Sequence, residues 1–167
     1  MAFIDFIKSA GEKLFHTGSA SAAQPSAAGA SSAAEKSAAA DAAAGDAILA
    51  YVKSQNLDAT ALTITYDSGT EVVTVYGVAK DQATKEKIIL CCGNVANVSR
   101  VNDKMSVEQS GPEAKFYTVK SGDTLSKISK DAYGDANQYQ KIFEANRPML
   151  KSPDKIYPGQ VLRIPPA

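Results

Sequence analysis

The chain has 167 residues and carries 18 basic and 18 acidic side chains, so its formal net charge is zero. This length suits one or two domains. Because no excess of positive charge creates a field that attracts polyanions, the composition argues against a nucleic-acid-binding protein. No stretch approaches the roughly 20 apolar residues of a membrane span, so we expect no stable membrane insertion.

Residues 1–15 have the spacing of an amphipathic helix, since Phe3, Ile7, Ala10 and Leu14 recur at intervals of three and four residues. Three arrangements fit such a helix: docking on the rest of the protein, lying on a membrane, or pairing with another helix. Its polar positions mix acidic and basic side chains, whereas membrane-surface helices carry a face rich in Lys and Arg. We therefore expect docking. The same charges interrupt the apolar stretch that a signal peptide needs, which predicts a cytoplasmic location.

Residues 16–45 are dominated by Ala, Ser and Gly. A segment of this composition buries too little apolar surface to offset the entropy lost on ordering, so it is predicted to be a flexible linker. A coil of about 30 residues spans roughly 30 Å on average. The linker is thus long enough for the first helix to fold back on the domain that follows.

Apolar spacing in residues 46–108 predicts a helix, two strands, a second helix and a last strand, in that order. Asp67-Ser68-Gly69-Thr70 has the composition of the turn between the two strands. Asp81 is predicted to cap the second helix, and Gly93-Asn94 to end it. Residues 109–115 include Gly111-Pro112 and are predicted to be a short linker.

The second predicted helix contains two adjacent cysteines, Cys91 and Cys92. Neighbouring cysteines rarely form a disulfide, and two thiols supply too few ligands for a closed zinc site. We therefore expect both to act as small buried apolar side chains in a reducing compartment.

Residues 116–167 carry a compact set of motifs in a fixed order. They are Phe116-Tyr117-Thr118-Val119-Lys120-Ser121-Gly122-Asp123-Thr124-Leu125, then Tyr133-Gly134-Asp135, then Tyr157-Pro158-Gly159-Gln160-Val161. This pattern resembles the LysM module, a βααβ unit best known for binding N-acetylglucosamine polymers such as peptidoglycan. Asp123 is predicted to cap the first helix of the unit.

The preceding block resembles a BON domain, on the motifs Val75-Tyr76-Gly77-Val78-Ala79 and Val95-Ala96-Asn97-Val98. A BON domain before a LysM domain, behind this N-terminal segment, resembles the cytoplasmic BON–LysM proteins of bacteria that bind potassium. The resemblance implies an α+β fold and a monomeric K⁺ sensor or buffer that compacts on binding, with an interface between its BON and LysM domains. The long Ala/Ser linker departs from the family pattern.

The resemblance also implies a K⁺ site built from backbone carbonyl oxygens. Carried over by position, it comprises Ile7, Ala10, Gly93, Val95, Asn97 and Val98, with Rb⁺ or Cs⁺ able to replace K⁺. Such a site is physically reasonable, because K⁺ is selected by several neutral carbonyls and the end of a helix leaves carbonyls unpaired at its negative pole. The alternative is an ordinary glycine-containing helix end beside an ordinary docked helix.

A rival interpretation is an envelope protein that binds peptidoglycan through its LysM domain. The loops that flank the sugar in such modules correspond here to residues 121–125 and 146–151. The candidate groove residues are Gly122, Asp123, Thr124, Asn146, Met149 and Leu150. Against this, Asp123 can simply cap a helix. An enzyme is not expected, because the single histidine, His16, lies at the edge of the linker and no phosphate loop or nucleophile motif is present.

Overall fold

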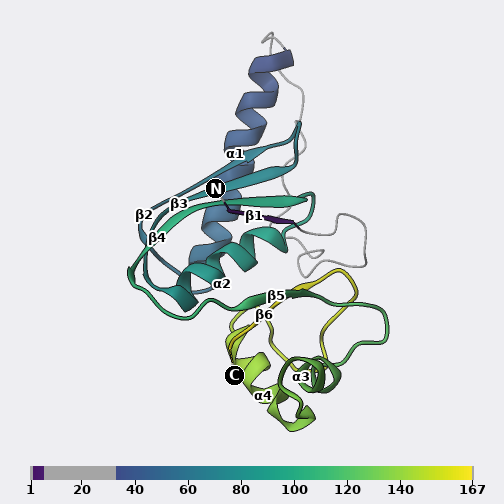
Figure 1. Cartoon of the computed structure of the whole chain (residues 1–167). Coiled ribbons are helices and arrows are strands. Elements are labelled where there is room, and N and C mark those ends of the chain that lie inside the picture. Colours follow the sequence, from purple (N-terminus) through teal and green to yellow (C-terminus); the bar gives the residue numbers. More distant parts are fainter. Residues whose placement is uncertain (1, 6–32, 167) are drawn as a thin grey trace.

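The computed structural model describes residues 2–5 and 33–166, and within them the predicted α+β fold is confirmed (Figure 1). The elements in chain order are β1 (Ala2–Asp5), α1 (Ala33–Ser54), β2 (Thr60–Asp67), β3 (Val72–Asp81), α2 (Gln82–Gly93), β4 (Arg100–Gln109), β5 (Lys115–Thr118), α3 (Leu125–Tyr133), the short 3₁₀ helix η1 (Ala136–Gln138), α4 (Tyr139–Ala145) and β6 (Val161–Ile164). The order of elements predicted after residue 46 is therefore correct.

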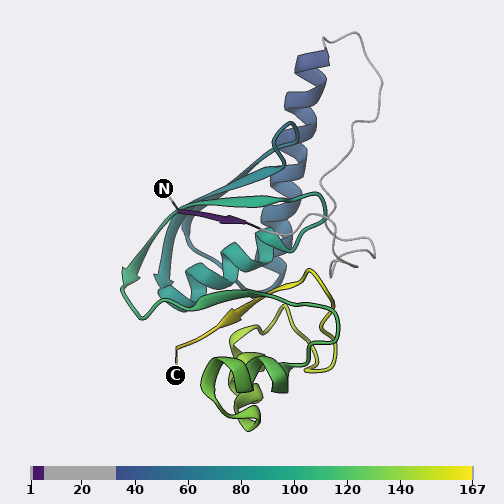
Figure 2. The same ribbon diagram turned by 45° about the vertical axis from the view of Figure 1, so that its right-hand side comes forward.

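The N-terminal unit is a four-stranded sheet in the order β1-β4-β3-β2, with α1 and α2 packed on one face (Figure 2). The strands β3 and β4 are parallel and α2 crosses between them, while the other two pairings are antiparallel. The face under the helices is apolar and includes Ile64, Val73, Val75 and Val101, all buried. The opposite face carries Tyr76, which is 45% exposed. This unit is thus a two-layer structure whose core lies between sheet and helices.

The prediction of a helix over residues 1–15 is wrong for Ala2–Asp5, which form β1. They pair antiparallel with β4, from Ala2 opposite Asp103 to Asp5 opposite Arg100. The edge of β4 offers unpaired backbone groups that a short segment can satisfy at once, whereas the first turn of a helix leaves its own N–H groups without partners. The rest of the predicted helix lies outside the described residues, and its docking stays a prediction.

The prediction of a flexible linker is wrong for residues 33–45, because α1 begins at Ala33. Alanine has the highest helix propensity, so an alanine-rich stretch extends a helix once the helix is anchored. The anchor is the core, where Ala44 and Ile48 are fully buried. Asp41 adds a contact, since its carboxylate accepts a hydrogen bond of 3.2 Å from the Ser68 backbone N–H. Residues 16–32 lie outside the described residues.

The C-terminal unit pairs β5 with β6 and packs α3 and α4 against them. The helix cap was predicted one residue too early: Thr124, not Asp123, caps α3 by accepting from the Lys127 N–H. Asp123 instead closes the preceding turn, where its carboxylate accepts 2.8 Å bonds from the Lys120 N–H and the Tyr117 hydroxyl. These bonds, that from Lys120 first, hold the pKa of Asp123 below its ordinary value.

The two units share one continuous hydrophobic core and are also joined by buried polar contacts. Glu86 of α2 receives a 2.6 Å ion-paired hydrogen bond from Arg163 of β6, with both side chains buried. The same carboxylate accepts from the Ala114 N–H at 2.9 Å. Charged groups are rarely buried unless they are paired, so this contact fixes how the units sit together. None of the helices in the described residues is long and apolar enough to cross a membrane.

Candidate functional site

The loop between α2 and β4 collects the described members of the predicted carbonyl site. Asp81 caps the start of α2 by accepting from the Thr84 N–H at 2.7 Å, as predicted. At the other end the helix stops at Gly93, and the N–H of Asn94 bonds back to the Leu90 carbonyl at 3.1 Å. The last carbonyls of a helix lack intrahelical donors, and the helix dipole is negative there. This loop is therefore electrostatically favourable for a cation.

The four described candidates lie within six consecutive residues but differ in their surroundings. Gly93, Val95 and Val98 are buried, while Asn97 is exposed and adopts the left-handed conformation with φ of 65°. The Val95 carbonyl accepts a 3.3 Å bond from the Val98 N–H, which closes the loop on itself. Loop residues with such local bonds hold their carbonyls in defined directions, as a site made of backbone oxygens requires.

Tyr66 of β2 is a contributor that sequence reasoning missed. Its hydroxyl donates a 2.9 Å hydrogen bond to the Asn97 carbonyl. Burial, the first cause, and the nearby carboxylates raise the pKa of Tyr66, so the phenol stays protonated and able to donate at neutral pH. The strand pattern does place Tyr66 on the buried face, but its partner is 31 residues away in sequence.

The two remaining candidates, Ile7 and Ala10, lie outside the described residues. The strand β1 nevertheless leads the chain toward the loop, because Asp5 pairs with Arg100, which follows Val98 by two residues. The strand β1 therefore ends beside the loop that holds the other candidates.

The chemistry of the donors suits a large monovalent cation. In the part of the chain that the structure describes, no group of three or more His, Cys, Asp or Glu side chains could hold a metal ion. Clustered carboxylates would favour Ca²⁺, whereas rings of neutral carbonyls favour K⁺. The cysteines of α2 are free and buried, as predicted, and burial raises the pKa of Cys91 to about 12. The thiols therefore stay protonated and are poor ligands.

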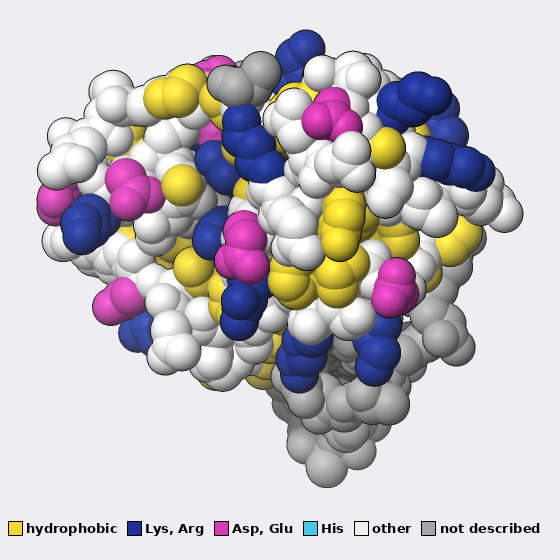
Figure 3. All heavy atoms as spheres, turned by 90° about the horizontal axis from the view of Figure 1, so that it is seen from below, with side chains coloured by type: hydrophobic (Ala, Val, Ile, Leu, Met, Phe, Trp, Pro, Cys, Tyr) yellow, Lys and Arg dark blue, Asp and Glu magenta, His cyan; other side chains and the backbone are white. Residues whose placement is uncertain are grey.

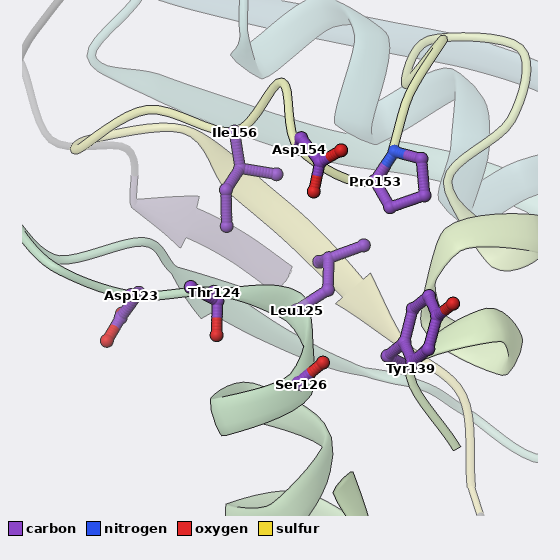
Figure 4. A pocket seen from close by; sticks show the side chains of 8 residues that line it. All are labelled: Asp123, Thr124, Leu125, Ser126, Tyr139, Pro153, Asp154 and Ile156. Atoms are coloured by element: carbon purple, nitrogen blue, oxygen red, sulfur yellow. The ribbon is translucent and has the colours of Figure 1, made fainter. Parts of the chain in front are cut away.

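A second candidate site is a cavity of about 390 Å³ in the C-terminal unit (Figure 4). Its walls come from the start of α3 and from the loop before β6, with Tyr139 at one end (Figure 4). The lining residues are Asp123, Thr124, Leu125, Ser126, Tyr139, Pro153, Asp154 and Ile156. Two of the predicted groove residues, Asp123 and Thr124, line it, and Gly122 adjoins them in the chain with φ of 82°.

Three predicted groove residues do not line this cavity, because they are buried elsewhere. Asn146 bonds to the backbone of Ile142 and Arg163, and Met149 and Leu150 are 3% and 0% exposed. The second wall of the cavity does come from the predicted connection between α4 and β6, but from its later part, residues 153–156, whose turn-forming Pro-Asp pair was the available signal. On the face seen in Figure 3, basic and acidic side chains both occur among apolar and uncharged ones.

Comparison with known proteins gives two family matches. Residues 40–109 match the BON domain and residues 117–165 match the LysM domain. The potassium binding protein Kbp of Escherichia coli O6:H1 is 55% identical over 108 residues, which is 65% of this chain and 71% of that protein. An uncharacterized protein of Deinococcus radiodurans is 55% identical over 49 residues, 29% of this chain and 19% of its own length. The uncharacterized protein YqbP of Bacillus subtilis is 32% identical over 82 residues, 42% of this chain and 37% of its own.

Proposed function

Because the chain belongs to the family of BON–LysM proteins that includes the potassium binding protein Kbp, we propose that it binds K⁺ through backbone carbonyl oxygens at the end of α2. The observation that carries the proposal is the loop of residues 93–98. It follows the C-terminus of α2, and a hydrogen bond within the loop, from the Val98 N–H, fixes the Val95 carbonyl. The protein acts as a cytoplasmic K⁺ sensor or buffer, is monomeric, and becomes more compact on binding. Rb⁺ and Cs⁺ can take the place of K⁺.

The described loop supports this proposal on two physical grounds. The negative pole of α2 and the neutral carbonyls of Gly93, Val95, Asn97 and Val98 provide attraction without carboxylates. A carbonyl oxygen has two lone pairs, so the Asn97 oxygen can accept from Tyr66 and still face an ion. Tyr66 then acts as a support that fixes the direction of this carbonyl.

The N-terminal segment completes the proposed shell with the carbonyls of Ile7 and Ala10. Ile7 follows Asp5 by two residues, so chain connectivity holds it within about 7 Å of the end of β1. That end lies opposite Arg100, next to the loop. Pairing of β1 with β4 thus keeps this part of the shell at high local concentration, and it provides a route by which ion binding orders the protein.

The proposal predicts that K⁺, but not Na⁺, stabilises the protein. A ligand present at 100 times its Kd adds about 2.7 kcal/mol to the free energy of unfolding, which raises the Tm by roughly 5–11 °C for a protein of this size. The measurement is thermal unfolding of the full chain during titration of KCl, with NaCl added to keep the ionic strength constant. Equal Tm values throughout the titration would sink the proposal.

A matched variant, Tyr66→Phe, tests whether the K⁺-dependent rise in Tm arises at the Asn97 carbonyl. Tyr66→Phe keeps the buried ring and removes only the hydroxyl that holds the Asn97 carbonyl. In this variant we expect the K⁺-dependent rise in Tm to need a higher KCl concentration. An unaltered titration would place the site away from Asn97.

The cavity in the LysM domain favours a second function, binding of N-acetylglucosamine polymers. A half-buried aromatic ring, Tyr139, and apolar Ile156 border it together with polar Asp123 and Asp154. If the LysM domain binds such polymers, insoluble peptidoglycan retains the protein. Tyr139→Ala is then expected to lower the retained fraction, whereas the control Tyr76→Ala, on the distant sheet face, leaves it unchanged. Passage of the unaltered protein through peptidoglycan without retention would exclude this function.

A further inference from the structure

The outer edge of β6 is covered by two asparagines that make the same contact. In a strand, the backbone N–H and C=O groups of alternate residues point to opposite edges. In β6 one set of these groups faces β5, and the backbone groups of Val161 and Arg163 point to the other edge. Asn146, after α4, accepts from the Arg163 N–H at 2.7 Å and donates to the Arg163 carbonyl at 2.8 Å. Its amide therefore takes the place of a neighbouring strand.

Asn94, after α2, repeats this arrangement from the other domain. Its amide accepts from the Val161 N–H at 3.0 Å and donates to the Val161 carbonyl at 3.0 Å. Each asparagine also donates to the carbonyl four residues earlier in its helix, that of Leu90 or Ile142. The LysM edge strand is thus completed by one residue of its own domain and by one residue of the BON domain.

Asn94 is also part of the candidate ion loop, because it lies between Gly93 and Val95. It is 1% exposed, and both its backbone N–H and its amide group bond to the Leu90 carbonyl. The side chain of Asn94 is fixed to β6, and its backbone N–H is fixed to α2. The peptide groups before and after Asn94 therefore have little freedom to rotate. The first of these peptide groups contains the Gly93 carbonyl, whose direction therefore depends on contact with the LysM domain.

We propose that Asn94 is a positioning residue of the ion site, through which docking of the LysM domain and binding of K⁺ stabilise each other. This inference rests on the proposed function, since it concerns one of the proposed ligands, the Gly93 carbonyl. Coupling between two equilibria is reciprocal: if docking improves the geometry for the ion, the ion strengthens docking by the same factor. Binding of K⁺ is therefore expected to oppose undocking, and the docked LysM domain keeps Asn94 in place beside the ion.

Titration calorimetry of the full chain with KCl tests the role of Asn94. Asn94→Ala is expected to weaken K⁺ binding at least tenfold. The control is Glu144→Ala, which removes an exposed side chain of the LysM domain away from the loop, and it is expected to weaken binding less than twofold. Binding by Asn94→Ala within twofold of the unaltered protein, or equal losses in the two variants, would overturn the inference.

The unaltered protein provides a second readout that does not depend on a variant that folds. Amide exchange measured by NMR in KCl and in NaCl compares Val161, held by Asn94, with Arg163, held by Asn146. K⁺ is expected to slow exchange at Val161 more than at Arg163, and equal slowing refutes the coupling. If the unaltered protein gives no K⁺ signal in either experiment, the proposed function itself fails; if it binds K⁺ without these differences, only the inference fails.

Discussion

Glu86→Ala is expected to lower the free energy of unfolding by about 3–5 kcal/mol, the usual effect of removing one partner of a buried ion pair. Glu86 is 4% exposed, and its carboxylate receives the 2.6 Å bond from Arg163, which is itself 7% exposed. Without it, a guanidinium group stays buried with no counter-charge. The variant also removes the acceptors for the Ala114 N–H and for the side-chain amide of Gln82.

Chemical denaturation at neutral pH measures this effect, and Glu144→Ala is the matched control. Glu144 pairs with Arg147 at 3.6 Å, but both side chains are more than half exposed. An exposed pair of this kind contributes about 0–1 kcal/mol. A loss below 1 kcal/mol for Glu86→Ala would show that the ion pair does not hold the two domains together.

The fold could be predicted where the signals are local. Alternating apolar residues define β2 and β3, and Asp81 and Gly93-Asn94 define both ends of α2. The contacts between the domains could not be predicted, because they join residues far apart in the chain. Glu86 and Arg163 are separated by 77 residues, and either alone resembles a solvent-exposed charge on a helix or strand.

In the candidate sites too, local features could be predicted and contacts between distant residues could not. The loop proposed for the ion was assigned from the family resemblance, and the helix end predicted at Gly93-Asn94 agreed with it. The support of this loop by Tyr66 and Asn94 could not be predicted, because a hydroxyl and an amide have no pattern that reveals a distant backbone partner. Met149 and Leu150 were assigned to the LysM groove because residues 146–151 correspond to a loop that flanks the sugar in such modules, whereas apolar side chains in a loop are equally suited to the core.

Gly45 shows why the start of α1 was misread. A glycine after a run of alanine and serine resembles the end of a linker, yet it lies inside α1 and is buried. A Cβ atom added there would lie 2.7 Å from the Ile64 carbonyl oxygen of β2. The glycine is therefore required by the close crossing of helix and strand, even though glycine lowers helix stability by about 0.5–1 kcal/mol relative to alanine.

Gly45→Val is accordingly expected to reduce the free energy of unfolding by about 3 kcal/mol, because the obstructing atom belongs to the backbone and only a shift of α1 relieves the overlap. Ala43→Val is the control, since Ala43 is exposed on the same helix and the change costs only about 0.7 kcal/mol of helix propensity. Thermal and chemical denaturation of the two variants separates the loss caused by the close contact of α1 with β2 from the loss caused by lower helix propensity. Equal losses in the two variants would mean that α1 does not need to approach β2 so closely. A selective loss at Gly45 would establish that the helix beginning at Ala33 is part of the BON core rather than an extension of the linker.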